Sequence, residues 1–168
     1  MNRLRDAMAE PHPHRPTLQD AEAICRKAGT RLTRLRRQVL SLLLEADGPV
    51  TAYELLDRLR SERSATAAGI YRSLDFLLAN GLAHRLESRK AFVACIHPDH
   101  PHVSQFLICR RCGTAVEVED ERISSVVGEW SRRLGFEVEA ESLEVSGSCA
   151  TCRTLPGEAA PSETAIDR

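Results

Sequence analysis

Four cysteines in the second half of the chain form two pairs, and each pair has the spacing of a metal-binding turn. The pairs are Cys109 with Cys112 and Cys149 with Cys152. A CxxC turn directs two sulfurs at one point, so two such turns supply the four thiolates of a closed tetrahedral zinc shell. A closed shell leaves no open position, so the pairs predict a structural zinc ion. Thioredoxin-like redox motifs are the competing interpretation, but they require a strand-to-helix context that neither pair has.

A second set of metal-ligand types is spread between residues 84 and 117. It contains two imidazoles, one thiolate and one carboxylate: His84, Cys95, His102 and Glu117. This mixture suits a four-coordinate zinc site. The thiolate argues against manganese or magnesium, and less firmly against ferrous iron. His97 and His100 are close enough along the chain to replace His102 or to form a weaker third site. The sequence therefore predicts two zinc ions per subunit, one structural and one in a site that bridges the two halves of the chain.

Composition limits the class of protein. No apolar run in the 168 residues approaches the ~20 that a membrane helix requires, and the N-terminus lacks the apolar core of a signal peptide. These features predict a cytoplasmic protein, in which paired cysteines are metal ligands rather than disulfides. Residues 17–94 carry 13 Lys and Arg against 9 Asp and Glu, whereas residues 95–168 carry 7 against 13. The asymmetry indicates that only the first half contacts a polyanion.

The basic half is patterned as helices followed by a hairpin. Four helices are expected, each begun by a hydroxyl N-cap: Thr17, Thr33, Thr51, and either Ser64 or Thr66. The third helix is expected to span residues 52–62. Cys25 falls on the apolar face of the first helix, which favours a buried residue over a ligand. Residues 82–87 and 91–95 have strand character and flank a basic tip, residues 88–90. This order predicts a winged helix, whose last helix enters the major groove of DNA and whose wing tip contacts phosphate.

Two side chains are candidates for reading bases. Arg72, on the groove side of the fourth helix, can pair bidentately with guanine, and Tyr53 lies at the start of the third helix. The alternative is a surface arginine and a half-buried tyrosine. Arg36 and Arg89 are predicted to contact phosphate. Further phosphate candidates are Arg31, Arg34, Arg37 and Lys90. Each of these six residues is equally consistent with a solvated charge.

Residues 104–153 predict a small α/β domain. Strands at 104–110 and 114–119 flank the first cysteine pair, a helix capped by Asp120 ends at Gly135, and a third strand covers 136–145. The unit has too little core to be stable alone, so we expect a dimer formed through the edge of its sheet. The complete division is a flexible arm at 1–16, a winged-helix domain at 17–94, a hinge and metal-binding loop at 95–103, this α/β domain, and a disordered tail at 154–168. The fold class is α+β.

Six segments of the chain resemble the ferric uptake regulator family, and within it the zinc uptake regulator branch. They are RLTRLRRQVL, TAYELLDRLR, IYRSLDFLLANGLAHRLES, FVAC, FLICRRCGTAVEVE and CATC, spread over roughly residues 18–153. Two positions depart from the family pattern. Arg34-Leu35 stands where the family usually has Pro-Gln, and Gly69 stands where it usually has Thr.

The resemblance implies a metal-dependent transcriptional repressor, not an enzyme, that binds palindromic operator DNA as a homodimer. It assigns the structural zinc to the four paired cysteines, the regulatory zinc to His84, Cys95, His102 and Glu117, and base contacts to Tyr53 and Arg72. The implied function is zinc-responsive control of zinc uptake and homeostasis genes. The main alternative is a sensor of iron, manganese or peroxide on the same scaffold. A zinc hydrolase and a zinc-ribbon protein-binding module are rivals from other classes, but a four-ligand site leaves no open position for a hydrolytic water.

Overall fold

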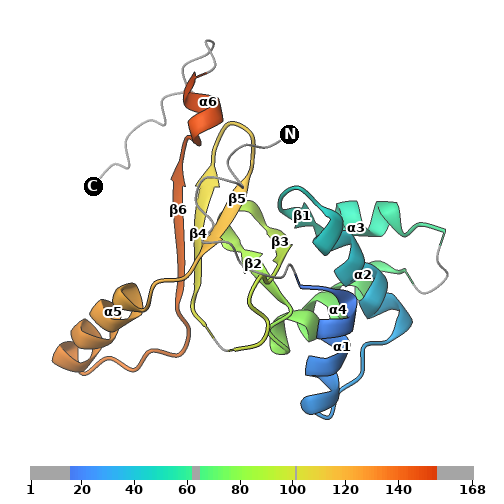
Figure 1. Cartoon of the computed structure of the whole chain (residues 1–168), viewed down its shortest axis with the longest axis horizontal. Coiled ribbons are helices and arrows are strands. Elements are labelled where there is room, and N and C mark those ends of the chain that lie inside the picture. Colours follow the sequence, from blue (N-terminus) through green and yellow to red (C-terminus); the bar gives the residue numbers. More distant parts are fainter. Residues whose placement is uncertain (1–15, 62–64, 101, 155–168) are drawn as a thin grey trace.

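The computed structural model describes residues 16–61, 65–100 and 102–154 (Figure 1). The predicted arm and tail lie outside these residues except for Pro16 and Thr154. Helices and strands form two units joined by the loop after residue 94, which confirms the α+β class. The division of the chain at residues 94, 103 and 153 remains a prediction.

Four helices surround the larger core. They are α1 (Leu18–Lys27), α2 (Arg34–Glu45), α3 (Ala52–Arg58) and α4 (Ala67–Ala79). Val39, Leu55, Ile70 and Leu74 are completely buried there, and Cys25 is only 1% exposed, as its place on the apolar face of α1 predicted. The apolar stripes therefore supply the burial that stabilises this unit.

Three of the four predicted N-caps are present. Thr17 and Thr51 each form a capping box with the acidic residue three positions later, and the Thr66 side chain accepts the N–H of Gly69. Thr33 stands at the N-cap position of α2, but its side chain makes no cap hydrogen bond, so that part of the prediction is wrong. The expected extent of α3 is also wrong, because the helix ends at Arg58 and continues as a turn.

A small sheet follows the helices and contains the wing. Strands β2 (Ala83–Leu86) and β3 (Ala91–Ala94) are antiparallel, and the short 3₁₀ turn η1 (Glu87–Arg89) joins them. Lys90 closes the tip in a left-handed conformation with φ of 49°. We call residues 83–94 the wing. A two-residue strand that the sequence did not predict, β1 (Val50–Thr51), pairs with β3 and links the wing to α3. Helices followed by this hairpin are the predicted winged helix.

The C-terminal sheet has β4 (Ser104–Cys109) at its centre. It runs antiparallel to β5 (Ala115–Val118) and parallel to β6 (Ser142–Gly147). The prediction of a strand over residues 136–145 is wrong at both ends. Alternation of Phe136 and Val138 with glutamates resembles a strand, but β6 pairs with the six residues of β4 only from Ser142 onward. A short helix that was not predicted, α6 (Ala150–Thr154), follows β6.

Helix α5 (Glu121–Leu134) connects β5 to β6 and extends away from the sheet (Figure 1). Asp120 caps it through the N–H of Arg122, and Gly135 ends it with φ of 63°, both as predicted. None of its residues is buried, and Trp130 is 56% exposed. Its apolar stripe is therefore without a partner inside the described part of this chain. Of the helices in that part, none is long and apolar enough to span a bilayer.

The wing and the C-terminal sheet share a second, smaller core. Leu86 of the wing packs with Phe106 and Ile108 of β4, and Val93 and Ala115 lie against the same cluster. The wing therefore contacts the sheet directly as well as through the connecting loop.

The capping box of α3 provides a test of the fold. We expect Thr51→Ala to lower the free energy of unfolding by ~1 kcal/mol, because the N–H of Glu54 loses the acceptor that lies 3.2 Å away. Urea denaturation followed by circular dichroism measures the change. Thr33→Ala is the matched control, since Thr33 makes no side-chain cap hydrogen bond. Equal destabilisation by the two substitutions would contradict this account of the caps.

Candidate metal centres

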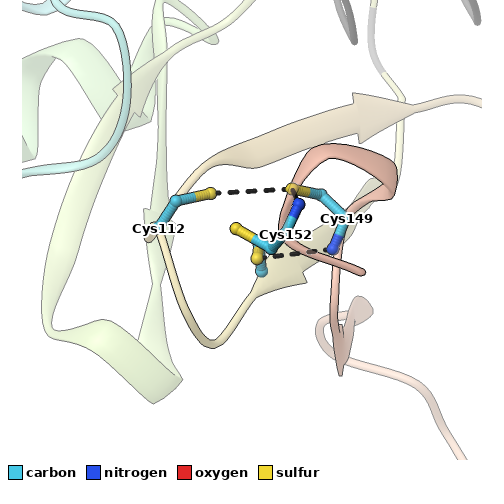
Figure 2. Close-up of side chains that lie close together, drawn as sticks. Cys112, Cys149 and Cys152 are labelled. Atoms are coloured by element: carbon cyan, nitrogen blue, oxygen red, sulfur yellow. Dashed lines mark hydrogen bonds between the residues drawn. The ribbon is translucent and has the colours of Figure 1, made fainter. Parts of the chain in front are cut away.

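The four paired cysteines converge at the end of the C-terminal sheet. Cys109 ends β4 and Cys112 follows it in the turn before β5, whereas Cys149 and Cys152 lie at and within the start of α6. Figure 2 shows the sulfurs of Cys112 and Cys149 facing each other from these two segments, 3.8 Å apart. All four sulfurs lie within 4.8 Å of one another, and all four residues are free cysteines. Zn–S bonds of ~2.3 Å place neighbouring sulfurs about 3.8 Å apart, so this group fits a tetrahedral zinc shell.

Backbone geometry presets the turn that carries the first pair. Gly113, with φ of 77°, allows the chain to reverse, and its N–H donates to the carbonyl oxygen of Cys109 at 3.0 Å. The N–H of Cys149 points at the Cys109 sulfur from 3.4 Å. The group is thus organised by the sheet and its turn as well as by ligand type.

Electrostatics favour a cation among these sulfurs. Burial opposes ionisation of Cys109, but N–H groups of Cys112, Cys149 and Arg111 donate to its sulfur and lower its pKa to about 6. The pKa of Cys152 is raised to about 12, first by its hydrogen bond with the Cys149 sulfur and then by burial and the other two sulfurs. Four adjacent thiolates repel one another unless a cation lies between them. A cation between the four sulfurs would relieve this repulsion.

The second predicted set also converges, at the joint between the wing and the sheet. His84 lies in β2, Cys95 follows β3, His102 precedes β4, and Glu117 lies in β5. The His102 Nε2 atom is 3.2 Å from His84 Nε2, 3.6 Å from Cys95 Sγ and 2.8 Å from Glu117 Oε1. We call these four residues the hinge site. One tetrahedral zinc with Zn–N bonds of ~2.0 Å requires ligand atoms roughly 3.3 Å apart, so the set fits.

Neighbouring oxygens orient both imidazoles. The His102 Nδ1–H donates to the carbonyl oxygen of His100 at 3.1 Å, which leaves its Nε2 lone pair facing the other ligands. The Ser104 hydroxyl lies 2.6 Å from His84 Nδ1 and orients that ring in the same sense. Both rings therefore present the ring nitrogen that a metal binds. Sequence reasoning did not find Ser104, because a serine at a strand start carries no signal of this contact.

The hinge site is shielded from solvent. Side chains of His102 and Glu117 are 5% and 4% exposed, and Cys95 is 1% exposed. Burial, and next the charge of Glu117, raise the pKa of the Cys95 thiol to about 12. Burial also opposes ionisation of Glu117, but the adjacent imidazoles of His84 and His102 and the hydrogen bond from the Ile96 N–H lower its pKa. Zinc binding at this site must therefore displace the Cys95 proton.

A third group of ligand types adjoins the hinge site. His100, His102 and Glu119 have ligand atoms within 4.8 Å of one another, and His100 Nε2 lies 2.8 Å from Glu119 Oε1. This hydrogen bond raises the pKa of His100. The group is exposed except at His102, which it shares with the hinge site. Of the three loop histidines, His102 is the one grouped with His84, Cys95 and Glu117.

The four side chains predicted to contact DNA differ in their exposure and in the contacts that they make within the chain. Tyr53 is 80% exposed at the start of α3, and Arg72 is exposed on α4. Arg36 instead lies over the Phe76 ring, 3.5 Å from its centroid, and donates to the carbonyl oxygen of Arg31. Arg89 donates to the carbonyl oxygen of Cys109 at 2.9 Å. The guanidinium groups of Arg36 and Arg89 thus contact other residues of the chain, whereas Tyr53 and Arg72 are exposed.

Comparison with known proteins identifies a matching family and several similar proteins. Residues 27–146 match the model of the Ferric uptake regulator family. The zinc uptake regulation protein of Escherichia coli (strain K12) is 39% identical over 137 residues, which are 80% of each chain. A crystal structure of holo XcZur is 46% identical with a TM-score of 0.77, covering 82% of this chain and 97% of that one. A zinc uptake regulator complexed with zinc and DNA is 39% identical with a TM-score of 0.78, covering 81% and 92%.

Paired cysteine substitutions test whether the two groups bind separate ions. We expect the purified protein to carry two zinc ions per chain and Cys95→Ser to carry one and remain folded. Cys149→Ser should unfold the C-terminal sheet and lose both ions, because Glu117 of the hinge site lies in β5. The reason is that the four-cysteine group joins β6 to the β4–β5 turn, so its metal contributes folding free energy. Elemental analysis combined with circular dichroism gives both readouts. Two ions retained in either variant would contradict this assignment.

Proposed function

The chain belongs to the ferric uptake regulator family, and from this membership we propose that it is a zinc-responsive transcriptional repressor that binds zinc and operator DNA. It is a transcription regulator and not an enzyme. The observation that carries the proposal is the hinge site. His84 lies in the first strand of the wing and Cys95 directly follows the second, whereas Glu117 comes from the C-terminal sheet. One ion held by these residues joins the DNA-binding unit to the rest of the protein.

The ligands explain how zinc controls DNA binding. While the hinge site is empty, the wing and the helices attached to it can turn relative to the sheet. When His84 and Cys95 share an ion with Glu117 and His102, that rotation is restricted. If the orientation that fits DNA is populated at about 1% without the ion, fixing it raises the affinity for DNA about a hundredfold, or ~2.7 kcal/mol. The metal therefore acts by selecting one orientation.

In a homodimer, DNA binding depends on the orientation of both DNA-binding units. Palindromic operators present two half-sites about 34 Å apart, and a dimer binds both only if its two recognition helices have that separation. Exposed apolar residues of the C-terminal unit are candidates for the dimer interface. They are Leu107, Val126, Val127, Trp130, Leu134, Phe136, Val138 and Val145. We propose that α5 and the adjoining sheet form the interface, because an apolar stripe of this extent is costly to leave in water.

The four paired cysteines complete the proposal with a second ion per subunit. Their group is closed, with four sulfurs and no vacancy for a substrate or water, so its zinc is structural. The hinge site is also four-coordinate, which argues against hydrolytic zinc. Its thiolate favours zinc over the harder ions that sibling sensors of manganese use, and argues less firmly against ferrous iron. The zinc uptake relatives support the same metal.

Zinc-dependent DNA binding tests the function. The probe is a palindromic duplex selected from random sequence by the zinc-loaded protein. We expect its affinity to rise about a hundredfold when the hinge site fills, and Cys95→Ser to abolish that response while the four-cysteine site stays loaded. Zinc-titrated mobility shifts measure both. Equal affinities with the hinge site empty and full would contradict the proposal, and an unaltered response in Cys95→Ser would favour a sensor of another metal.

Base recognition by α4 is tested separately. We expect Arg72→Ala to weaken binding to the selected duplex by ~1–3 kcal/mol and to relax its sequence preference, because a bidentate contact with guanine is lost. Arg153→Ala removes the same charge from an exposed position on α6 and is the matched control. Competition between the selected duplex and a scrambled one measures the preference. Equal losses in the two variants would show that Arg72 contributes only charge.

A further inference from the structure

One row of residues crosses the face of the C-terminal sheet that the wing contacts. Phe106 of β4 is paired with Glu117 on β5 and with Glu144 on β6. Paired residues on neighbouring strands point to the same face of a sheet, so a buried aromatic ring lies between two carboxylates. Glu117 belongs to the hinge site, and Glu144 has no role in either metal group.

The wing follows this row from one carboxylate to the other. At its base, His84 Nε2 lies 2.9 Å from Glu117 Oε1, and the His84 ring packs against Phe106. Leu86, two residues further, belongs to the cluster around Phe106. At the tip, the N–H groups of Glu87 and Ser88 donate to the two oxygens of Glu144 at 2.6 and 3.1 Å. Strand β2 and the η1 turn that follows it therefore contact all three members of the row in order.

A second contact reinforces the tip. Arg89 donates to the carbonyl oxygen of Cys109, at the end of the same central strand that carries Phe106. Burial opposes ionisation of Glu144, but its hydrogen bonds with Ser88 and with the Glu87 N–H lower its pKa. The carboxylate is thus charged where it meets the tip, and charge-assisted hydrogen bonds of this kind are stronger than neutral ones.

We propose that Glu144 is a positioning residue that docks the wing tip on β6 and so sets the orientation of the DNA-binding unit together with the hinge metal. The hinge metal fixes the base of the wing to the sheet at one point, and the wing can still rotate about that point. Contacts at the tip supply the second point, which removes that rotation. The inference rests on the proposed function, since it assigns Glu144 a part in zinc-dependent DNA binding.

Half-site and palindromic DNA separate orientation from folding. A duplex with one half-site binds a single DNA-binding unit, whereas the selected palindrome requires two units correctly oriented. At saturating zinc we expect Glu144→Ala to weaken binding to the palindrome about tenfold and to leave binding to the half-site within twofold. Glu144→Gln keeps one acceptor oxygen and should fall between Glu144→Ala and the parent. The control is Glu139→Ala, which removes an exposed carboxylate from the segment before β6.

Each contrary outcome has a distinct meaning. Palindrome binding by Glu144→Ala equal to that of the parent would overturn the positioning role. Equal losses of affinity for the palindrome and the half-site would show that Glu144 stabilises the fold and does not orient the DNA-binding unit. Tighter binding by Glu144→Ala would show that the carboxylate competes with DNA phosphate for the wing tip, which is the reverse of docking. A parent protein that binds the palindrome without regard to zinc would instead refute the proposed function.

Discussion

The buried carboxylate of Glu117 is the interaction on which the arrangement of the wing and the sheet depends. It accepts the Ile96 N–H at 3.1 Å and lies within 3 Å of a ring nitrogen of both His84 and His102. A buried charge that loses such partners is strongly destabilising, so partial separation of the wing from β5 is unfavourable. The hinge is therefore expected to be either assembled or open. This behaviour is what a metal-controlled switch requires, because binding then selects between two arrangements.

Strand β4 connects the two metal groups. Its first residue, Ser104, orients the His84 ring, and its last residue, Cys109, contributes a sulfur to the four-cysteine group. Phe106, between them, lies in the small core shared with the wing. Strand β6 pairs with β4, and β6 in turn carries the carboxylate that meets the wing tip. In the proposed function the two metal groups thus have different roles on a common framework, one maintaining the sheet and the other controlling what docks on it.

Local signals in the sequence predicted most helices and both ligand sets. Thr17 with Asp20 and the CxxC spacings are short-range patterns with a direct physical cause. Errors arose where the outcome depends on a distant partner. The start of β6 is determined by the length of β4, its partner strand, which is far away in the sequence. For the same reason Glu144, one of several glutamates in an acidic segment, could not be distinguished before its register with Phe106 was known.

The central claim is that the hinge site and the DNA-binding surface share one equilibrium. Thermodynamic linkage then requires the effect to be reciprocal, so DNA must tighten zinc binding by the factor with which zinc tightens DNA binding. The direct measurement is the zinc affinity of the hinge site, in protein with its four-cysteine group loaded, with and without saturating palindromic DNA. The account predicts an affinity about a hundredfold higher with DNA. The same zinc affinity in both conditions would contradict it.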